Sequence, residues 1–127
     1  MTDVNSKINR AVWFDIPVVD LDRAIAFYRG VLAVDVSKES FGEMEFAVLE
    51  HQDGNGGCLV IKPESVSSGG VLLYLNVDGR IRDAVAKVSE LAGTLMEDVH
   101  PIGPHGFRAL IQDSEGNGLA LHSRTDA

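Results

Sequence analysis

The sequence is poor in cysteine, tryptophan and basic side chains, and it has no long hydrophobic run. Its single cysteine, Cys58, excludes an intrachain disulfide and a zinc site of the C-x-x-C type. The 11 Lys and Arg residues are outnumbered by 19 Asp and Glu residues, which gives a formal net charge of -8. Because an acidic surface repels nucleic-acid phosphates and anionic membranes, we expect neither as a partner.

The chain has 127 residues, of which 45% are hydrophobic, as is typical of one globular domain. No apolar stretch approaches the roughly 20 residues that a membrane-spanning helix needs. Residues 1–10 form a polar tail without the apolar core of a secretory signal. We therefore expect a cytoplasmic protein.

An internal repeat with a period of about 60 residues organises the sequence. Apolar residues follow the spacing of one helical face over 21–32 and again over 81–92. Asp20 precedes the first of these segments and is a suitable N-cap. Gly93 follows the second, where it predicts a left-handed C-cap. The repeat therefore predicts two equivalent amphipathic helices.

Strand-like segments surround each predicted helix in the same order. One precedes each helix, at 11–18 and 71–77, and three follow it. Those that follow are 34–38, 43–49 and 56–61 in the first copy and 94–98, 107–112 and 116–121 in the second. One copy is too small to bury much surface alone, so the two must share a core. We expect one α+β domain of two βαβββ modules, 11–62 and 71–123, joined by a linker at 63–70.

Two motifs, one near each end of the chain, carry a resemblance to a known family. The first is WFDIPVVDLDRA at 13–24, followed by Phe27-Tyr28. The second is Gly106-Phe107, followed by DSEGN at 113–117. Together they resemble the vicinal oxygen chelate superfamily, the group of glyoxalase I, bleomycin resistance proteins, fosfomycin resistance enzymes and extradiol dioxygenases. The resemblance implies a glyoxalase-like cupped, partly open barrel made by the two βαβββ repeats, and a homodimer.

Enzymes of that superfamily hold a divalent metal through the first and last strands of each repeat. The resemblance places these ligand positions at Trp13, Val60, Leu72 and Ala120. None of the four side chains offers an imidazole, a carboxylate or a thiolate. We therefore expect no metal and no other cofactor. The alternative is a divalent metal such as zinc, nickel, iron or manganese, held by non-standard residues.

The alternation of side chains along strands predicts what else lines the cup. If the four positions above point inward, the expected ligand-binding residues are Trp13, Asp15, Cys58, Lys62, Tyr74, Asn76 and His122. Aromatic area with a few polar groups is typical of a small-molecule pocket. This favours a protein of the bleomycin-resistance kind, without enzymatic activity, that binds a small hydrophobic or aromatic organic molecule.

A glyoxalase-like lyase or isomerase, or a dioxygenase, is the alternative interpretation. Asp15 and His122 are its candidate catalytic residues, as an acid–base pair or as metal ligands. A histidine of the segment 100–105 is a further candidate ligand. The breakers around His100 and His105 favour a solvated loop that can act as a lid.

The candidate residues also have structural interpretations. Trp13 is suited to filling a core, and Asp15 to pairing with Lys62 or an arginine. His122 is suited to a structural role with its hydrogen bonds satisfied. Cys58 is expected to be an inert buried thiol, because no helix N-terminus or cation is evident near it.

Overall fold

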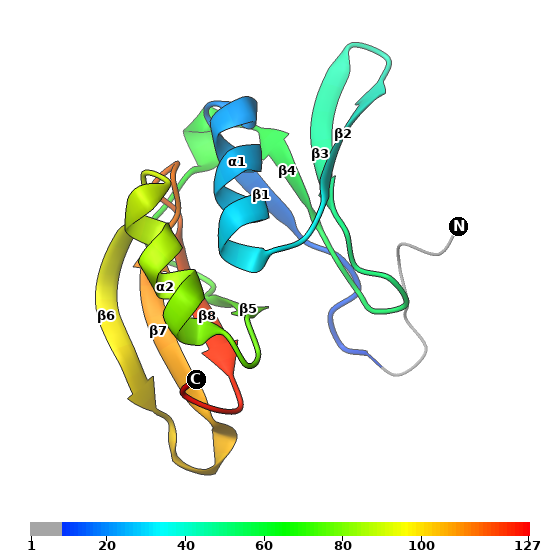
Figure 1. Cartoon of the computed structure of the whole chain (residues 1–127). Coiled ribbons are helices and arrows are strands. Elements are labelled where there is room, and N and C mark those ends of the chain that lie inside the picture. The colour runs from blue at the N-terminus through cyan, green and yellow to red at the C-terminus, as the bar shows by residue number, and fades with distance from the viewer. Residues whose placement is uncertain (1–8) are drawn as a thin grey trace.

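The computed structural model describes residues 9–127 as two βαβββ modules (Figure 1). The first module consists of β1 (Asp15–Val18), α1 (Leu21–Leu32), β2 (Val36–Phe41), β3 (Met44–Leu49) and β4 (Cys58–Ile61). The second consists of β5 (Leu73–Asn76), α2 (Ile81–Glu90), β6 (Thr94–Pro101), β7 (Phe107–Gln112) and β8 (Gly118–Ser123). Short 3-10 turns follow β4 and β6, η1 (Pro63–Ser65) and η2 (Gly103–His105). Residues 1–8 of the expected N-terminal tail lie outside the described residues.

Each module forms one four-stranded sheet with its first strand at an edge. The strand orders are β1-β4-β3-β2 and β5-β8-β7-β6. In both sheets the first strand pairs in parallel with the last, and the other neighbours are antiparallel. The identical topology of the two sheets confirms the predicted α+β fold of two repeats. The sheets are cupped, and they do not close into a complete barrel.

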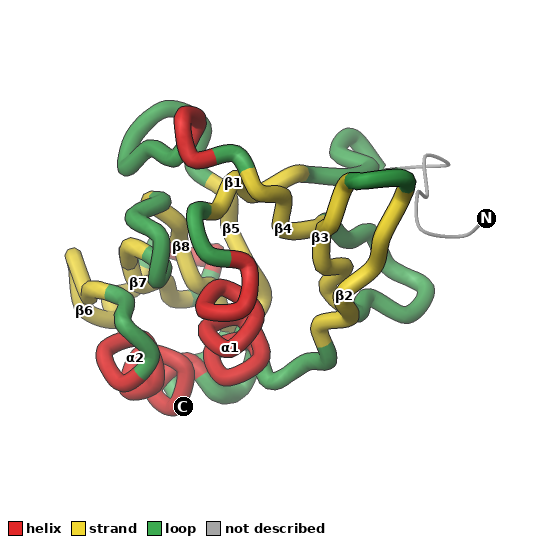
Figure 2. The backbone as a smooth tube through the Cα atoms, turned by 90° about the horizontal axis from the view of Figure 1, so that it is seen from above, coloured by secondary structure: helices red, strands yellow, loops and turns green. Residues whose placement is uncertain are grey.

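Both helices cover the same side of the two sheets and pack against each other (Figure 2). Strand alternation explains why this side is apolar. Ile16 and Val18 near α1, and Leu75 in the second sheet, are buried, whereas Asp15 and Tyr74 point to the opposite side and are exposed. Buried side chains of both modules form one core, as expected for modules too small to fold alone. We call the side of each sheet away from the helices its open face.

The N-cap predicted for α1 is present in the structure, whereas the C-cap predicted for α2 is not. Asp20 caps α1, because its carboxylate accepts the N–H of Arg23 at 3.1 Å. The left-handed cap predicted at Gly93 is wrong. Helix α2 ends at Glu90, and the left-handed conformation falls on Ala92, with φ 72°. Ala33 takes the same conformation after α1, with φ 55°.

Gly93 is needed for a different reason, the close approach of the α2 end to its neighbours. A Cβ atom here would lie 2.6 Å from Phe27 Cε2 and 2.8 Å from the carbonyl oxygen of Gln112. We therefore expect Gly93→Ala to lower the free energy of unfolding by about 2 kcal/mol through overpacking, measured by urea unfolding. Gly69→Ala is the matched control, because a Cβ there meets no atom within 4 Å. An equal loss in both variants would contradict this explanation.

The turn between β7 and β8 connects the second module to the first through Asp113. This buried carboxylate accepts the Tyr28 hydroxyl at 2.5 Å and the backbone N–H groups of Glu115 and Asn117 at 2.8 and 2.9 Å. Burial, and then the charge of Asp113, raises the pKa of Tyr28 well above its ordinary value, so the phenol remains a donor. The Asn117 amide also donates to the Pro17 carbonyl at 2.8 Å.

Glu115, in the same turn, binds the N-terminus of α1. Its carboxylate accepts the backbone N–H groups of Val19 and Asp20 at 2.9 and 2.8 Å, and it pairs with the Arg23 guanidinium at 2.7 Å. Burial alone would raise the pKa of Glu115, but the hydrogen bonds from Arg23, Asp20 and Val19 outweigh it and lower the pKa to about 2. The closing motif DSEGN therefore has a structural role, since it holds the two modules together.

Several strands are shifted from their predicted ranges because pairing decides where a strand ends. β1 begins at Asp15, later than residue 11, because its partner β4 begins only at Cys58. β6 continues to Pro101, beyond residue 98, because it pairs along β7 as far as Phe107. Among residues 9–127, no helix is both long enough and apolar enough to cross a bilayer.

Candidate functional site

Trp13, Asp15 and Cys58 lie together on the open face of the first sheet. The Cys58 thiol donates to Asp15 Oδ1 at 3.2 Å, and the two residues are partners in the β1–β4 register. Burial, and then the hydrogen bond to Asp15, raises the pKa of Cys58 to about 11, although a hydrogen bond with Trp13 opposes this shift. A thiol with this pKa is protonated at neutral pH and is a poor nucleophile, as expected for an inert cysteine.

The other polar contacts on this sheet are few. The rings of Trp13 and His51 meet edge to face, with their centroids 5.9 Å apart. Lys62 is exposed just after β4, and its backbone N–H donates to the Val18 carbonyl at 3.0 Å. Among residues 9–127, no ion pair joins Lys62 to Asp15. The partner of Asp15 is therefore Cys58 rather than a cation.

The open face of the second sheet carries a row of polar side chains. Asn76, His122, Arg108 and His100 are paired in register across β5, β8, β7 and β6. Arg108 donates from Nε to His100 Nε2 at 3.0 Å and from Nη1 to the Tyr74 hydroxyl at 2.6 Å. The Arg108 guanidinium therefore fixes the hydroxyl end of Tyr74, a residue that is 45% exposed.

The histidines near the β6–β7 turn have backbone partners. His122 Nε2 donates to the carbonyl of His105 at 2.7 Å, which leaves Nδ1 for another partner. His105 lies in η2 and is exposed. The prediction that His100 lies in a solvated loop is wrong, because β6 extends through it and it is partly buried beside Arg108.

Arg108 is a site residue that the sequence reasoning missed. The signal was nevertheless present, because Ala109 and Ile111 are apolar and, in the structure, buried. Alternation then places Arg108 and Leu110 on the open face. The metal positions of the family lie on the first and last strands of each repeat, and β7 is neither, so they do not point to it.

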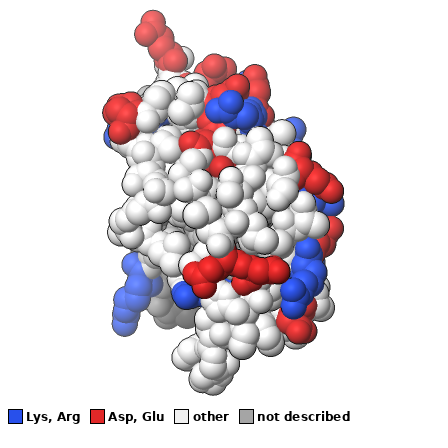
Figure 3. Space-filling model, turned by 90° about the vertical axis from the view of Figure 1, so that its left-hand side faces the viewer, with Lys and Arg blue, Asp and Glu red and all other residues white. Residues whose placement is uncertain are grey.

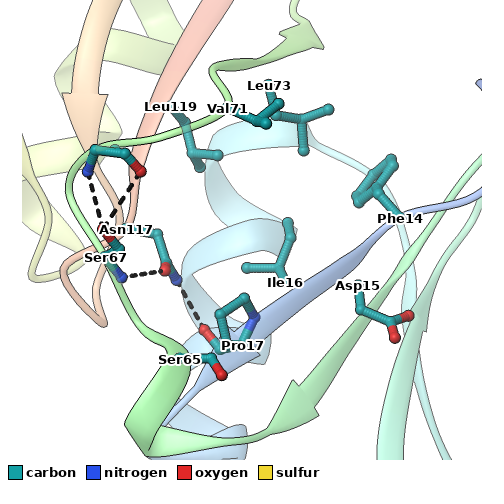
Figure 4. Close-up of a pocket in the computed structure, with 12 residues that line it drawn as sticks. Phe14, Asp15, Ile16, Pro17, Ser65, Ser67, Val71, Leu73, Asn117 and Leu119 are labelled. Atoms are coloured by element: carbon teal, nitrogen blue, oxygen red, sulfur yellow. Dashed lines mark hydrogen bonds between the residues drawn. The ribbon is translucent and has the colours of Figure 1, made fainter.

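Two pockets lie between the modules, and Phe14 lines both of them. In the smaller, of about 250 Å³, the apolar side chains point toward a common space, and the Asp15 carboxylate points away from it (Figure 4). The residues that line this pocket include Phe14, Ile16, Pro17, Val71, Leu73 and Leu119, with Ser65, Ser67 and Asn117 as polar groups.

The larger pocket has a volume of about 410 Å³ and combines apolar and polar groups from both modules. Its lining includes Phe14, Leu32, Val34, Leu49, His51, Asn55, Tyr74 and Asn76. We call the two pockets together the seam. Of the predicted ligand-binding residues, Asp15 lines the smaller pocket and Tyr74 and Asn76 line the larger. The structure does not bring the rest to the seam, because Trp13, Cys58, Lys62 and His122 line neither pocket.

The strand register revises one of the four positions that the resemblance assigns to metal ligands. Ala120 pairs with Tyr74, whereas the corresponding residue of β1, Asp15, pairs with Cys58. The counterpart of Ala120 in the first module is therefore Cys58 and not Val60. The sequence alignment of the repeats missed this because the connection before β4 is longer than the turn before β8.

The residues at these revised positions do not fit a metal of the kind the resemblance implies. An indole N–H at Trp13 is a donor only, and Leu72 and Ala120 have no ligating atom. Cys58 is the one potential ligand among the four, and its hydrogen bond to Asp15 brings a single carboxylate beside it. Within the described part of the chain, no three His, Cys, Asp or Glu side chains gather closely enough to hold a metal ion.

Comparisons with known proteins place this geometry in context. The model of the Glyoxalase/Bleomycin resistance protein/Dioxygenase superfamily matches residues 7–121. A solved glyoxalase/bleomycin resistance protein from Albidiferax ferrireducens T118 is 16% identical, with TM-score 0.71 over 91% of this chain and 100% of that one. A fosfomycin resistance protein from Listeria monocytogenes is 11% identical, with TM-score 0.69 over 91% of this chain and 93% of that one.

A lactoylglutathione lyase from Agrobacterium tumefaciens is also similar, at 16% identity, with TM-score 0.60 over 92% of this chain and 96% of that one. At these identities the solved structures show a shared fold alone. None of the curated proteins matches the chain.

Proposed function

Because the chain belongs to the glyoxalase/bleomycin resistance protein/dioxygenase superfamily, we propose that it is a member that binds a small hydrophobic or aromatic organic molecule in the seam. The observation that carries this proposal is the larger pocket, with about 410 Å³ of space between the modules. Ligand sites are typically pockets of roughly 300–1,000 Å³ with an apolar lining and a few polar groups. Phe14, Leu49 and Tyr74 supply that lining, and Asn76 and His51 supply polar groups.

Binding in the proposed site needs no metal. Among the metal-ligand positions as the strand register revises them, only Cys58 has an atom that can ligate a metal. The Asp15 carboxylate beside it makes two potential ligands, and among residues 9–127 no cluster of three such side chains is present. The chemistry of these side chains therefore supports a binding function that does not depend on the metal.

The alternative, a lyase, isomerase or dioxygenase that uses Asp15 and His122, has less support. Asp15 belongs to the first sheet, where its carboxylate accepts the thiol of Cys58. His122 belongs to the second sheet, where Nε2 is engaged by the His105 carbonyl. No shared pocket of the seam is lined by both side chains, which an acid–base pair acting on one substrate would require.

We expect Phe14→Ala to weaken the binding of small aromatic molecules by about tenfold or more, because Phe14 lines both pockets of the seam. Ligands are found by their stabilising effect on thermal unfolding, and their affinities are then measured by calorimetry on the folded variants. Phe41→Ala is the matched control, because Phe41 is 77% exposed on the β2–β3 hairpin. If every ligand found in this way bound Phe14→Ala as tightly as the wild type, the seam would not be the binding site.

The homodimer implied by the resemblance and the cytoplasmic location stay predictions. Surfaces suited to a second copy are present, because Phe41 and Met44 face each other across the β2–β3 hairpin and are both exposed. The β6 side of the molecule also has a broad uncharged area, with charged side chains gathered mainly around it (Figure 3).

A further inference from the structure

We propose that Arg108 binds an anion, and that the molecule held in the seam is a carboxylate with an apolar or aromatic body. This inference rests on the proposed function, since it names the chemical class of that ligand. Arg108 lies in the middle of β7, on the open face of the second sheet, and is partly buried. Three features of its surroundings carry the inference: the absence of a carboxylate partner among the described residues, the way the side chain is held, and its position beside the seam.

Arg108 has no carboxylate partner in the part of the chain that the structure describes. Some other arginines do, since Arg23 pairs with Glu115 and Arg124 pairs with Asp78, whereas Arg29 donates to the Val36 carbonyl. A partly buried guanidinium without a counter-ion is costly, because its charge is only partly solvated. An anionic ligand would supply the missing charge.

Two neutral groups hold the Arg108 side chain in place. His100 Nδ1 donates to the Asp98 carbonyl at 2.8 Å, so Nε2 is the acceptor of the Arg108 Nε–H, as in a neutral imidazole. The Tyr74 hydroxyl accepts from Nη1. A guanidinium has five N–H donors, so these bonds leave three for a ligand. A fixed fork of charged donors matches the two oxygens of a carboxylate.

A small residue makes room for this arrangement. To reach Tyr74 on β5, the side chain of Arg108 must cross β8, where Ala120 lies between Tyr74 and Leu110 in the register. Ala120 has only a methyl group, so it offers neither a steric barrier nor a competing charge. The guanidinium therefore keeps its charge available on the open face.

The position of Tyr74 connects this charge to the seam. Tyr74 and Asn76 line the larger pocket, and the hydroxyl of the same Tyr74 contacts Arg108. A ligand whose body lies against Tyr74 can therefore place an anionic group at Arg108. The chain's net charge of -8 disfavours multiply charged phosphates, so a singly charged carboxylate is the better match.

The test compares carboxylates with their uncharged amides by calorimetry on the full chain. Benzoate, phenylacetate and 1-naphthoate are each paired with the corresponding amide. We expect at least one acid to bind the wild type about tenfold or more tightly than its amide, and Arg108→Gln to abolish this preference. Arg82→Gln, on the exposed surface of α2, removes an equal charge elsewhere and is expected to keep the preference.

A second variant keeps the test decisive if Arg108→Gln does not fold. Tyr74→Phe retains the guanidinium and the ring but removes the hydroxyl that holds Nη1, so we expect a several-fold loss for the acid and none for the amide. Equal binding of acids and amides, no detectable binding of any acid, or an unchanged preference in Arg108→Gln would overturn the inference. Binding of neutral aromatics without a preference for acids would refute this inference and leave the proposed function standing.

Discussion

Replacing Asp113 with alanine is expected to lower the free energy of unfolding by about 3–5 kcal/mol, the largest effect of any single change considered. The Asp113 carboxylate accepts the Tyr28 hydroxyl, the Asn117 side-chain amide and two backbone N–H groups. Its removal leaves several buried donors without an acceptor, and each such donor costs about 1–3 kcal/mol. Water that enters the space left by the carboxylate can accept from some of these donors, so the expected total is smaller than the sum of the single costs. The measurement is urea unfolding at neutral pH, analysed for the midpoint and the slope.

Two further variants separate this contact from general effects of losing a carboxylate. Asp53→Ala, in the exposed connection between β3 and β4, is the matched control and is expected to change stability by less than about 0.5 kcal/mol. Tyr28→Phe removes one donor and keeps the carboxylate, so its effect should be intermediate. If Asp113→Ala were no more harmful than Asp53→Ala, the turn between β7 and β8 would not hold the modules together as described.

Replacing Glu115 with glutamine should lower the free energy of unfolding by about 3 kcal/mol at neutral pH, with the loss disappearing in acid. The pKa of Glu115 is about 2 in the folded protein, against an ordinary value of 4.5. A shift of that size corresponds to about 3 kcal/mol in favour of the charged, folded form. The pKa is lowered on folding, so this stabilisation is fully present above about pH 4.5 and is lost as the pH falls through about 2.

The test follows the stability of wild type and Glu115→Gln by urea unfolding across that pH window. The two curves should lie apart at neutral pH and converge toward pH 2, since the protonated carboxyl no longer attracts Arg23 or the start of α1. Glu90→Gln, at the exposed end of α2, should follow the wild type throughout. A constant difference between wild type and Glu115→Gln at every pH would show that the charge of Glu115 contributes nothing.

Much of the fold follows from local patterns in the sequence. The spacing of apolar residues predicts α1 from Leu21 to Leu32, as the structure has it, because the helix buries that one face. The repeat predicts the second module with the same topology. Where the prediction failed, at Gly93, the residue serves a contact with Phe27 and Gln112, which are distant in the sequence.

The candidate site depended more on contacts between distant segments. Alternation places Asp15 and Cys58 on one face, and the structure joins them by a hydrogen bond. The counterpart of Ala120 was misplaced at Val60, because the register of a parallel pair depends on loop length as well as on the strand. Arg108 became a candidate binding residue only through its hydrogen bonds to His100 and Tyr74, which lie on other strands of the same sheet.

The sequence by itself determined the α+β class and the two repeated modules, and it stated which residue types stand at the positions that the resemblance assigns to metal ligands. Those properties depend on residue type and on spacing over a few turns of chain, which a sequence states directly. Only the tertiary structure decided that Asp113 and Glu115 bind α1, that the seam lies beside Phe14, and that Arg108 has no carboxylate partner among residues 9–127. The physical reason is that hydrogen bonds, pockets and charge pairing depend on distances between side chains far apart in the sequence.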